Sequence, residues 1–122
     1  MNDLELIGRL LENSYSHPSP SATYSIKHRL SGNNLELNYA SIVHFASEQS
    51  LQQQLVRLRE QAAQLVDDSL AKLKKDFRDS SGSTLRLEDH GGNDNLELIS
   101  STSNSPRKIA YFKYNRVVEI AS

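Results

Sequence analysis

The sequence predicts an α+β fold: an antiparallel β-sheet of about five strands, in the order ββαβββ, with one long α-helix packed on one face and a short N-terminal helix. Two observations predict it. Residues 47–78 place apolar residues at helical spacing over their whole length. The stretches before and after them alternate apolar and polar residues and are separated by turns that contain Gly and Asn, which is typical of half-buried strands.

The first predicted element is a short amphipathic helix over residues 1–13, followed by a linker over residues 14–22 that contains Pro18 and Pro20. A helix does not continue through such a linker, because proline lacks the backbone N–H. A helix of about ten residues is marginal in water by itself, so its apolar stripe needs a surface. That surface is either the remaining domain, residues 23–122, or a neighbouring subunit or another protein. The stripe, a predicted protein-interaction surface, comprises Leu4, Ile7, Leu10 and Leu11.

A β-hairpin is expected next, with strands at residues 23–30 and 35–45. Its turn is Gly32-Asn33-Asn34, because Gly and Asn tolerate positive φ. Alternation in the first strand puts one set of side chains toward the core: Tyr24, Ile26, His28 and Leu30. The hairpin therefore leads directly into the long helix.

The long helix is predicted from Ser47, a good N-cap, to Arg78, with Gly82 as a left-handed terminator. About 31 residues give a helix of roughly 46 Å, whereas a compact chain of this size has a diameter of roughly 35 Å. We therefore expect one end of the helix to overhang the sheet or to be covered by another subunit. The alternative is a kink or an early end near Asp67–Asp68. The apolar stripe comprises Leu51, Leu55, Leu58, Ala62, Val66, Leu70, Leu73 and Phe77.

Three strands are expected after the helix, at residues 84–89, 96–100 and 107–120, with a turn at 90–94 and a polar loop at 101–106. The last strand is apolar on both faces, so it lies either at the centre of the sheet or at a contact. One parity comprises Ala110, Phe112, Tyr114, Val118 and Ile120. The other parity, a predicted protein-interaction surface, comprises Ile109, Tyr111 and Val117.

Composition narrows the class of protein. The net charge of −1 and the pI near 6.4 do not favour nonspecific binding to nucleic acid or acidic membranes. Cysteine is absent, which excludes a disulfide scaffold and a thiolate metal site. No apolar run approaches the roughly 18 residues of a membrane span, and no secretory signal opens the chain, so a cytoplasmic protein is expected. An apolar content of 37% indicates a modest core, completed by a partner: a second copy or another structural protein.

No pattern predicts catalysis, a cofactor or a metal ion. The four histidines have no ligand spacing, such as i and i+4 on a helix. A nucleophile elbow of the Gly-x-Ser-x-Gly type is absent, and the glycine pairs do not form a phosphate loop. Glu88-Asp89-His90 is more simply a polar hairpin turn than an acid–base site. We therefore expect a protein that is not an enzyme, with no catalytic, cofactor-binding or metal-binding residues.

One surface indicates an alternative class. Lys27 and Arg29 lie on the outward side of the first strand, and Tyr111, Lys113 and Arg116 lie on the last. If these strands are neighbours, they form a basic face with an aromatic ring that can stack on and neutralise single-stranded nucleic acid. A solvated or subunit-contacting sheet face is the simpler interpretation, because the total charge is near zero. The sequence does not predict the strand order that decides between them.

Two stretches, Leu37–Phe45 and Ser103–Phe112, resemble small uncharacterised proteins of T4-like marine phages (cyanophages), of the kind found among structural and assembly genes. The resemblance extends from about Tyr24 to Ile120, leaves out the first twenty residues and carries no catalytic residues. It implies a role in the virion or its assembly in an infected bacterium. The expected function is that of an oligomeric structural or assembly protein. The alternatives are a single-stranded nucleic-acid-binding regulator that uses Lys27, Arg29, Tyr111 and Lys113, and a small enzyme.

Overall fold

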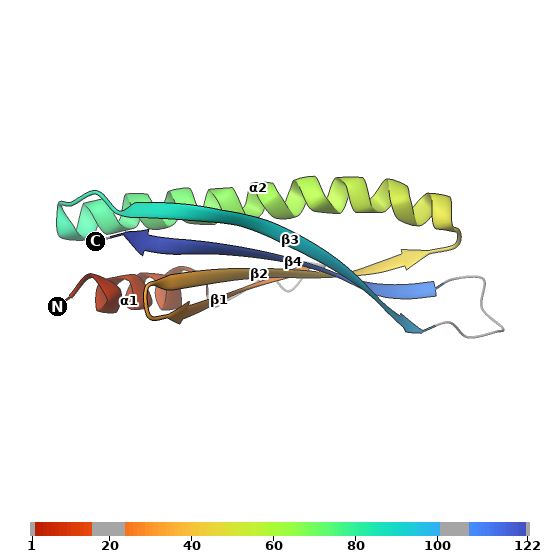
Figure 1. Ribbon diagram of the computed structural model, residues 1–122, viewed down its shortest axis with the longest axis horizontal. Helices are drawn as coiled ribbons and strands as arrows, with labels where there is room; N and C mark the ends of the chain where they lie inside the picture. The colour runs from red at the N-terminus through yellow and green to blue at the C-terminus, as the bar shows by residue number, and fades with distance from the viewer. Residues whose placement is uncertain (1, 16–23, 101–107, 122) are drawn as a thin grey trace.

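The structure is a computed structural model, which describes residues 2–15, 24–100 and 108–121 (Figure 1). Most of the predicted linker and the predicted polar loop lie outside the described residues. The fold is α+β, with an antiparallel sheet, one long helix and a short N-terminal helix, which confirms the predicted class. The elements are α1 (Asp3–Tyr15), β1 (Tyr24–Ser31), β2 (Asn34–Phe45), α2 (Glu48–Ser81), β3 (Arg86–Ser100) and β4 (Lys108–Ala121).

The four strands form one antiparallel sheet in the order β1-β2-β4-β3. The predicted hairpin pairs β1 with β2, and Gly32 takes a positive φ of 58° in its turn. β4 pairs with β2 from Asn34–Glu119 to Phe45–Lys108 without a shift. The last strand is therefore central in the sheet. Its helix-facing side is apolar because that side is buried in the core.

The predicted number of five strands is wrong, because the two strands expected at residues 84–89 and 96–100 are one strand, β3. The residues expected to turn form a bulge, in which the pairing with β4 shifts between Asp89 and Gly92 and then continues. Gly91 has a φ of 87°, and its N–H donates to Oδ1 of Asp89 at 2.8 Å. β4 is an unbroken template beside these residues, so the extra residue is absorbed locally and the chain does not reverse.

α2 is one continuous helix of 34 residues, without a break at Asp67–Asp68. The predicted caps are confirmed: Oγ of Ser47 accepts a hydrogen bond from the N–H of Ser50 at 3.1 Å, and Gly82 ends the helix with a φ of 74°.

The overhang of the long helix is confined to its C-terminal end, because the sheet is nearly as long as the helix. α2 has 34 residues and a length of about 51 Å, and β3 has 15 residues and a length of about 50 Å. The sheet therefore runs along most of the helix, and only the C-terminal end of α2 extends past the strands (Figure 1). The stripe is buried within one chain at Leu51, Leu55, Ala62, Val66, Leu70, Leu73 and Phe77.

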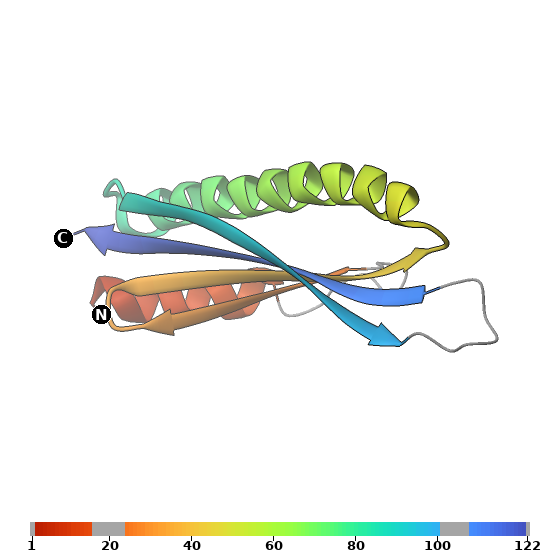
Figure 2. The same cartoon turned by 45° about the vertical axis from the view of Figure 1, so that its right-hand side comes forward.

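α1 packs on its own chain, which is one of the two alternatives left open for it. It contacts α2 and β1, and lies beside α2 on the same face of the sheet (Figure 2). Ile7 is fully buried and Leu11 nearly so. Leu4 and Leu10 are half-buried against the core. Of the predicted interaction stripe, Ile7 and Leu11 are therefore not accessible to a partner while α1 stays in place.

The core lies between the helices and one face of the sheet. An aromatic group fills its middle: Tyr24 stacks on Tyr39 with ring centroids 5.4 Å apart, and Phe112 meets Tyr39 edge-on at 6.1 Å. The core-facing side chains of β1 include His28, which is half-buried, as expected for a histidine at the edge of the core. His44 is exposed on the opposite face.

Arg116 is buried inside the fold and does not belong to a basic face. Its Nη1 donates to Oδ1 of Asp67 on α2 at 3.0 Å and to Oδ2 of Asp89 on β3 at 2.9 Å. Its Nε and Nη2 donate to Oη of Tyr114 at 2.8 and 2.5 Å. Gly92 is the register partner of Arg116, and a Cβ there would overlap the ring and Oη of Tyr114. The glycine therefore makes room for the tyrosine that supports the guanidinium.

We expect Gly92→Ala to lower the free energy of unfolding by about 1–3 kcal/mol, because the added methyl group displaces Tyr114. Gly8→Ala is the matched control. A Cβ at Gly8 meets nothing within 4 Å, so this change should stabilise α1 by about 0.5–1 kcal/mol. Urea denaturation followed by circular dichroism measures both. Equal effects of the two substitutions would contradict the packing of Tyr114 on Gly92.

Burial lowers the pKa of the His28 imidazole. The unfolded chain then binds a proton near pH 6.5 that the folded chain resists. The contribution of His28 to stability is therefore fully present above that pH and is lost as the pH falls through the lower, folded pKa. We expect the loss of stability between pH 7 and pH 5 to be smaller in His28→Gln than in the wild type. Denaturation at a series of pH values tests this, and identical pH profiles would contradict it.

Candidate functional site

Exposed apolar side chains gather at one end of the molecule. This distal end is where β2 and β3 finish and where α2 and β4 begin (Figure 1). All large hydrophobic residues that are exposed in the described part of the chain lie in this half: Ile42, Val56, Leu96, Leu98, Ile99 and Tyr111. Since exposed hydrophobics scattered over a surface are ordinary but those concentrated in one region mark interaction sites, the distal end is the candidate functional site.

The distal apolar residues of the strands lie on both faces of the sheet. Register with β4 puts Leu96 and Leu98 on the helix-facing side of β3, because they pair with the buried Phe112 and Ala110. Ile42 pairs with Tyr111 on the opposite, outer face. The end of β3 twists away from α2, which is visible from both directions (Figures 1 and 2). Leu98 consequently keeps 57% of its surface exposed although it points to the helix side.

The predicted interaction residues of the last strand separate in the structure. Tyr111 belongs to the distal end beside Ile42, and Ile109 is the next outward residue of β4. Val117 shares their parity but lies toward the other end of β4, where it lines a shallow hollow with Arg29 and Glu36. Two of the three predicted residues therefore contribute to the candidate site.

Charges at the distal end are neutralised within the chain. Asp94 on β3 forms an ion pair with Arg59 on α2. Glu97 on β3 lies with its Oε2 3.5 Å from Nζ of Lys113, and that ammonium also lies 5.9 Å from the centroid of the Tyr111 ring. These two acidic residues are thus held by neighbours on the same molecule, so they do not give the distal end a strong field of one sign.

The residues of the predicted nucleic-acid face all lie on the outer face, but their strands are not neighbours, because β2 separates β1 from β4. Lys27 and Lys113 line one hollow of about 440 Å³, together with Asn38, Asn93, Asn95 and Asn115. Arg29 faces Glu36 across β1 and β2, and Tyr111 lies farther along. The charged outward residues balance on the described strands: Lys27, Arg29, Arg86 and Lys113 against Glu36, Glu88, Glu97 and Glu119.

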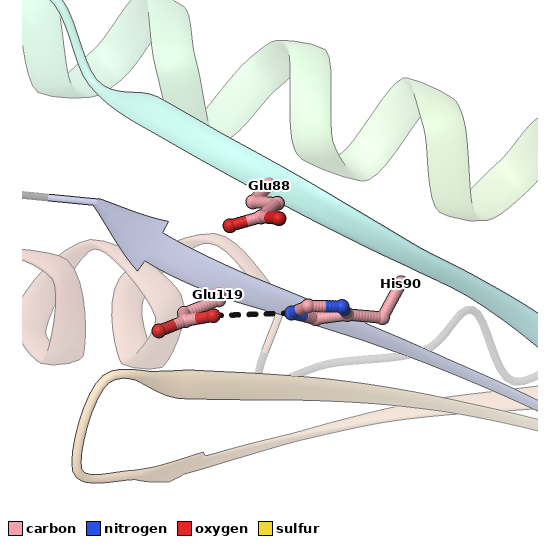
Figure 3. A group of neighbouring side chains, drawn as sticks. All are labelled: Glu88, His90 and Glu119. Carbon is pink, nitrogen blue, oxygen red and sulfur yellow. Dashed lines mark hydrogen bonds and ion pairs between the residues drawn. The ribbon is translucent and has the colours of Figure 1, made fainter.

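A second cluster joins Glu88 and His90 of β3 to Glu119 of β4, at the end opposite the distal site (Figure 3). Glu88 and Glu119 are direct cross-strand partners, and Nε2 of His90 lies 3.2 Å from Oε2 of Glu119. Ligand atoms of all three residues lie within 4.8 Å of one another. Carboxylate and imidazole donors are those that Zn²⁺ and Mn²⁺ accept, so these residues could hold such an ion at the surface.

Sequence reasoning missed both of these arrangements. The glutamate–histidine cluster needs the pairing of β3 with β4, and only the spacing of Glu88 and His90 on one strand face could have indicated it. The distal residues Leu96, Leu98 and Ile99 were expected in a short strand, without a prediction of whether they are buried. Their exposure follows from the edge position of β3, which no local pattern reveals.

Comparison with known protein families, with curated proteins and with solved structures finds no match. Within the described ranges, the helices include none that is long and apolar enough to cross a membrane.

We expect Glu88→Gln to stabilise the protein by about 0.5 kcal/mol at low salt, because it removes a like-charge pair across two strands. The gain should shrink at high salt as the repulsion is screened. Glu97→Gln, on the same strand but beside Lys113, is the matched control and should be neutral or slightly destabilising. Urea denaturation in EDTA measures both. A Glu88→Gln protein less stable than the wild type would show that the two carboxylates do not repel each other.

Proposed function

We propose that the protein is a non-enzymatic assembly protein that associates with further copies of itself through the distal end. The observation that carries this proposal is the confinement of the exposed large hydrophobics to that one end. A chain that folds alone normally distributes such residues singly over its surface, whereas a contiguous group is stabilised by burial against a partner.

The fold supports an interaction role in a second way. The long helix, the sheet and α1 already enclose a core that includes Ile7, Val66 and Phe112, so the chain does not need a partner in order to fold. The distal apolar residues are not part of that core. An exposed apolar surface that the fold does not need is typical of a protein that associates with a partner.

The converging polar groups are engaged with each other, which favours a structural role over a catalytic one. Asp67 and Asp89 hold Arg116, and His90 lies against Glu119. The resemblance of Leu37–Phe45 to phage proteins supports assigning the assembly role to a tailed-phage particle, in the virion or in the cytoplasm of the infected bacterium. The balanced charges of the outer face do not favour the nucleic-acid alternative, so association with its own kind is the proposed function.

Light scattering after size exclusion at micromolar concentration tests this function. We expect the wild type to have a mass above the 13.7 kDa of one chain. Leu96→Lys should return it to that mass, because burying an unpaired ammonium costs at least about 2 kcal/mol, or about thirtyfold in Kd.

Ser83→Lys is the control, since Ser83 is exposed at the opposite end. It should leave the mass unchanged. A wild type that stays a single chain at these concentrations would overturn the proposed function.

A further inference from the structure

We propose that β3 pairs edge to edge and antiparallel with β3 of a second copy, with the Leu96 residues of the two copies opposite each other at a two-fold axis. This inference rests on the proposed self-association and names the surface that mediates it. β3 is an edge strand among the described residues: β4 pairs with one of its sides, and no described strand lies beside the other. Such an edge offers backbone donors and acceptors in register for another strand.

The two edges of the sheet differ in their protection. β1 carries Lys27 and Arg29, and α1 packs against it. Between Gly92 and Ile99, β3 contains no lysine, arginine or proline, which are the residues that commonly keep edge strands apart. The β3 edge is therefore the one open to pairing.

The positions of the distal apolar residues favour an edge contact over a face contact. Leu96 and Leu98 lie on the helix side of β3, at the edge itself, whereas Tyr111 lies on the outer side of the adjacent β4 and Ile42 on that of β2, one strand farther in. A partner lying on the outer face would leave the leucines in water. A partner that continues the sheet covers the leucines of both copies on the helix side.

Charge favours the register centred on Leu96, in which two apolar side chains meet at the axis. It sets Leu96 against Leu96, Glu97 against Asn95, and Asp94 against Leu98, so no like charges meet. Centring the pair on Glu97 or on Asp94 would place two carboxylates opposite each other, which is destabilising. Asp94 and Glu97 already have cationic partners in Arg59 and Lys113, so little net charge remains to oppose the approach. The pairing stays within the bulge-free segment Gly92–Leu98.

The resulting dimer is closed. Antiparallel pairing of identical edge strands creates a two-fold axis perpendicular to the sheet, so the contact is isologous. The helices of both copies lie on the same side of one continuous sheet, and the Gly92–Leu98 part of each open edge is used in the contact. Further growth through β3 is therefore blocked.

Disulfide trapping tests the inference, because the chain has no cysteine of its own. Directly opposite residues of an antiparallel pair have Cα atoms about 4.5–5.5 Å apart, within the range that a disulfide spans. Leu96→Cys should therefore convert most of the protein to a covalent dimer under mild oxidation. Val56→Cys, at the same end but on α2, should remain a single chain although Val56 is more exposed than Leu96 (54% against 37%).

A mixture of two exposed variants provides an independent check that does not depend on replacing Leu96. Asn95→Cys and Glu97→Cys should each remain uncrosslinked alone and should form a heterodimer when mixed. If light scattering shows association but neither experiment gives these crosslinks, edge pairing is wrong while self-association stands. Crosslinking of Glu97→Cys with itself would overturn the register. A wild type that never associates would overturn the inference together with the proposed function.

Discussion

The buried guanidinium of Arg116 is the interaction on which the arrangement of the three longest elements depends. It reaches from the central strand to Asp67 on α2 and to Asp89 on β3, and rests on the hydroxyl group of Tyr114. A desolvated guanidinium is costly unless its donors are satisfied, so α2 and β3 must both be in place for the site to be stable. The same requirement accounts for the bulge: Asp89 belongs to the ion pair, and Gly92 leaves room for the tyrosine.

The two halves of the molecule on either side of Arg116 have different surfaces. On one side of Arg116, α1 and α2 lie together over the sheet, and residues such as Ile7 and Phe77 are shielded from water. On the other side α2 continues beyond the end of α1, and the sheet twists away beneath it (Figure 2). Leu96 and Leu98 are exposed because β3 is the edge strand that twists away from α2, not because the local sequence is unusual. The twist of this edge thus creates the candidate interaction surface.

Much of the fold follows from the sequence, because its signals are local. The cap at Ser47, the terminator at Gly82 and the alternation of the hairpin each depend on neighbouring residues, and all were predictable. The continuity of β3 was not, since glycines at 91–92 suit a turn and a bulge equally well and only the length of β4 decides between them. The candidate site was predicted only in part: Tyr111 was found from its parity, but the exposure of Leu98 depends on strand order, which is a property of the whole sheet.

The position of β4 has a consequence for how the chain reaches this structure. β4 follows every other strand in the sequence, yet it lies between β2 and β3 and pairs with both. Until it is synthesised, the emerging chain holds a two-stranded hairpin, a long helix with a bare apolar stripe and an unpaired β3. Folding of the sheet must therefore await the synthesis of β4, and before that the nascent protein passes through a stage in which its most apolar surfaces are uncovered.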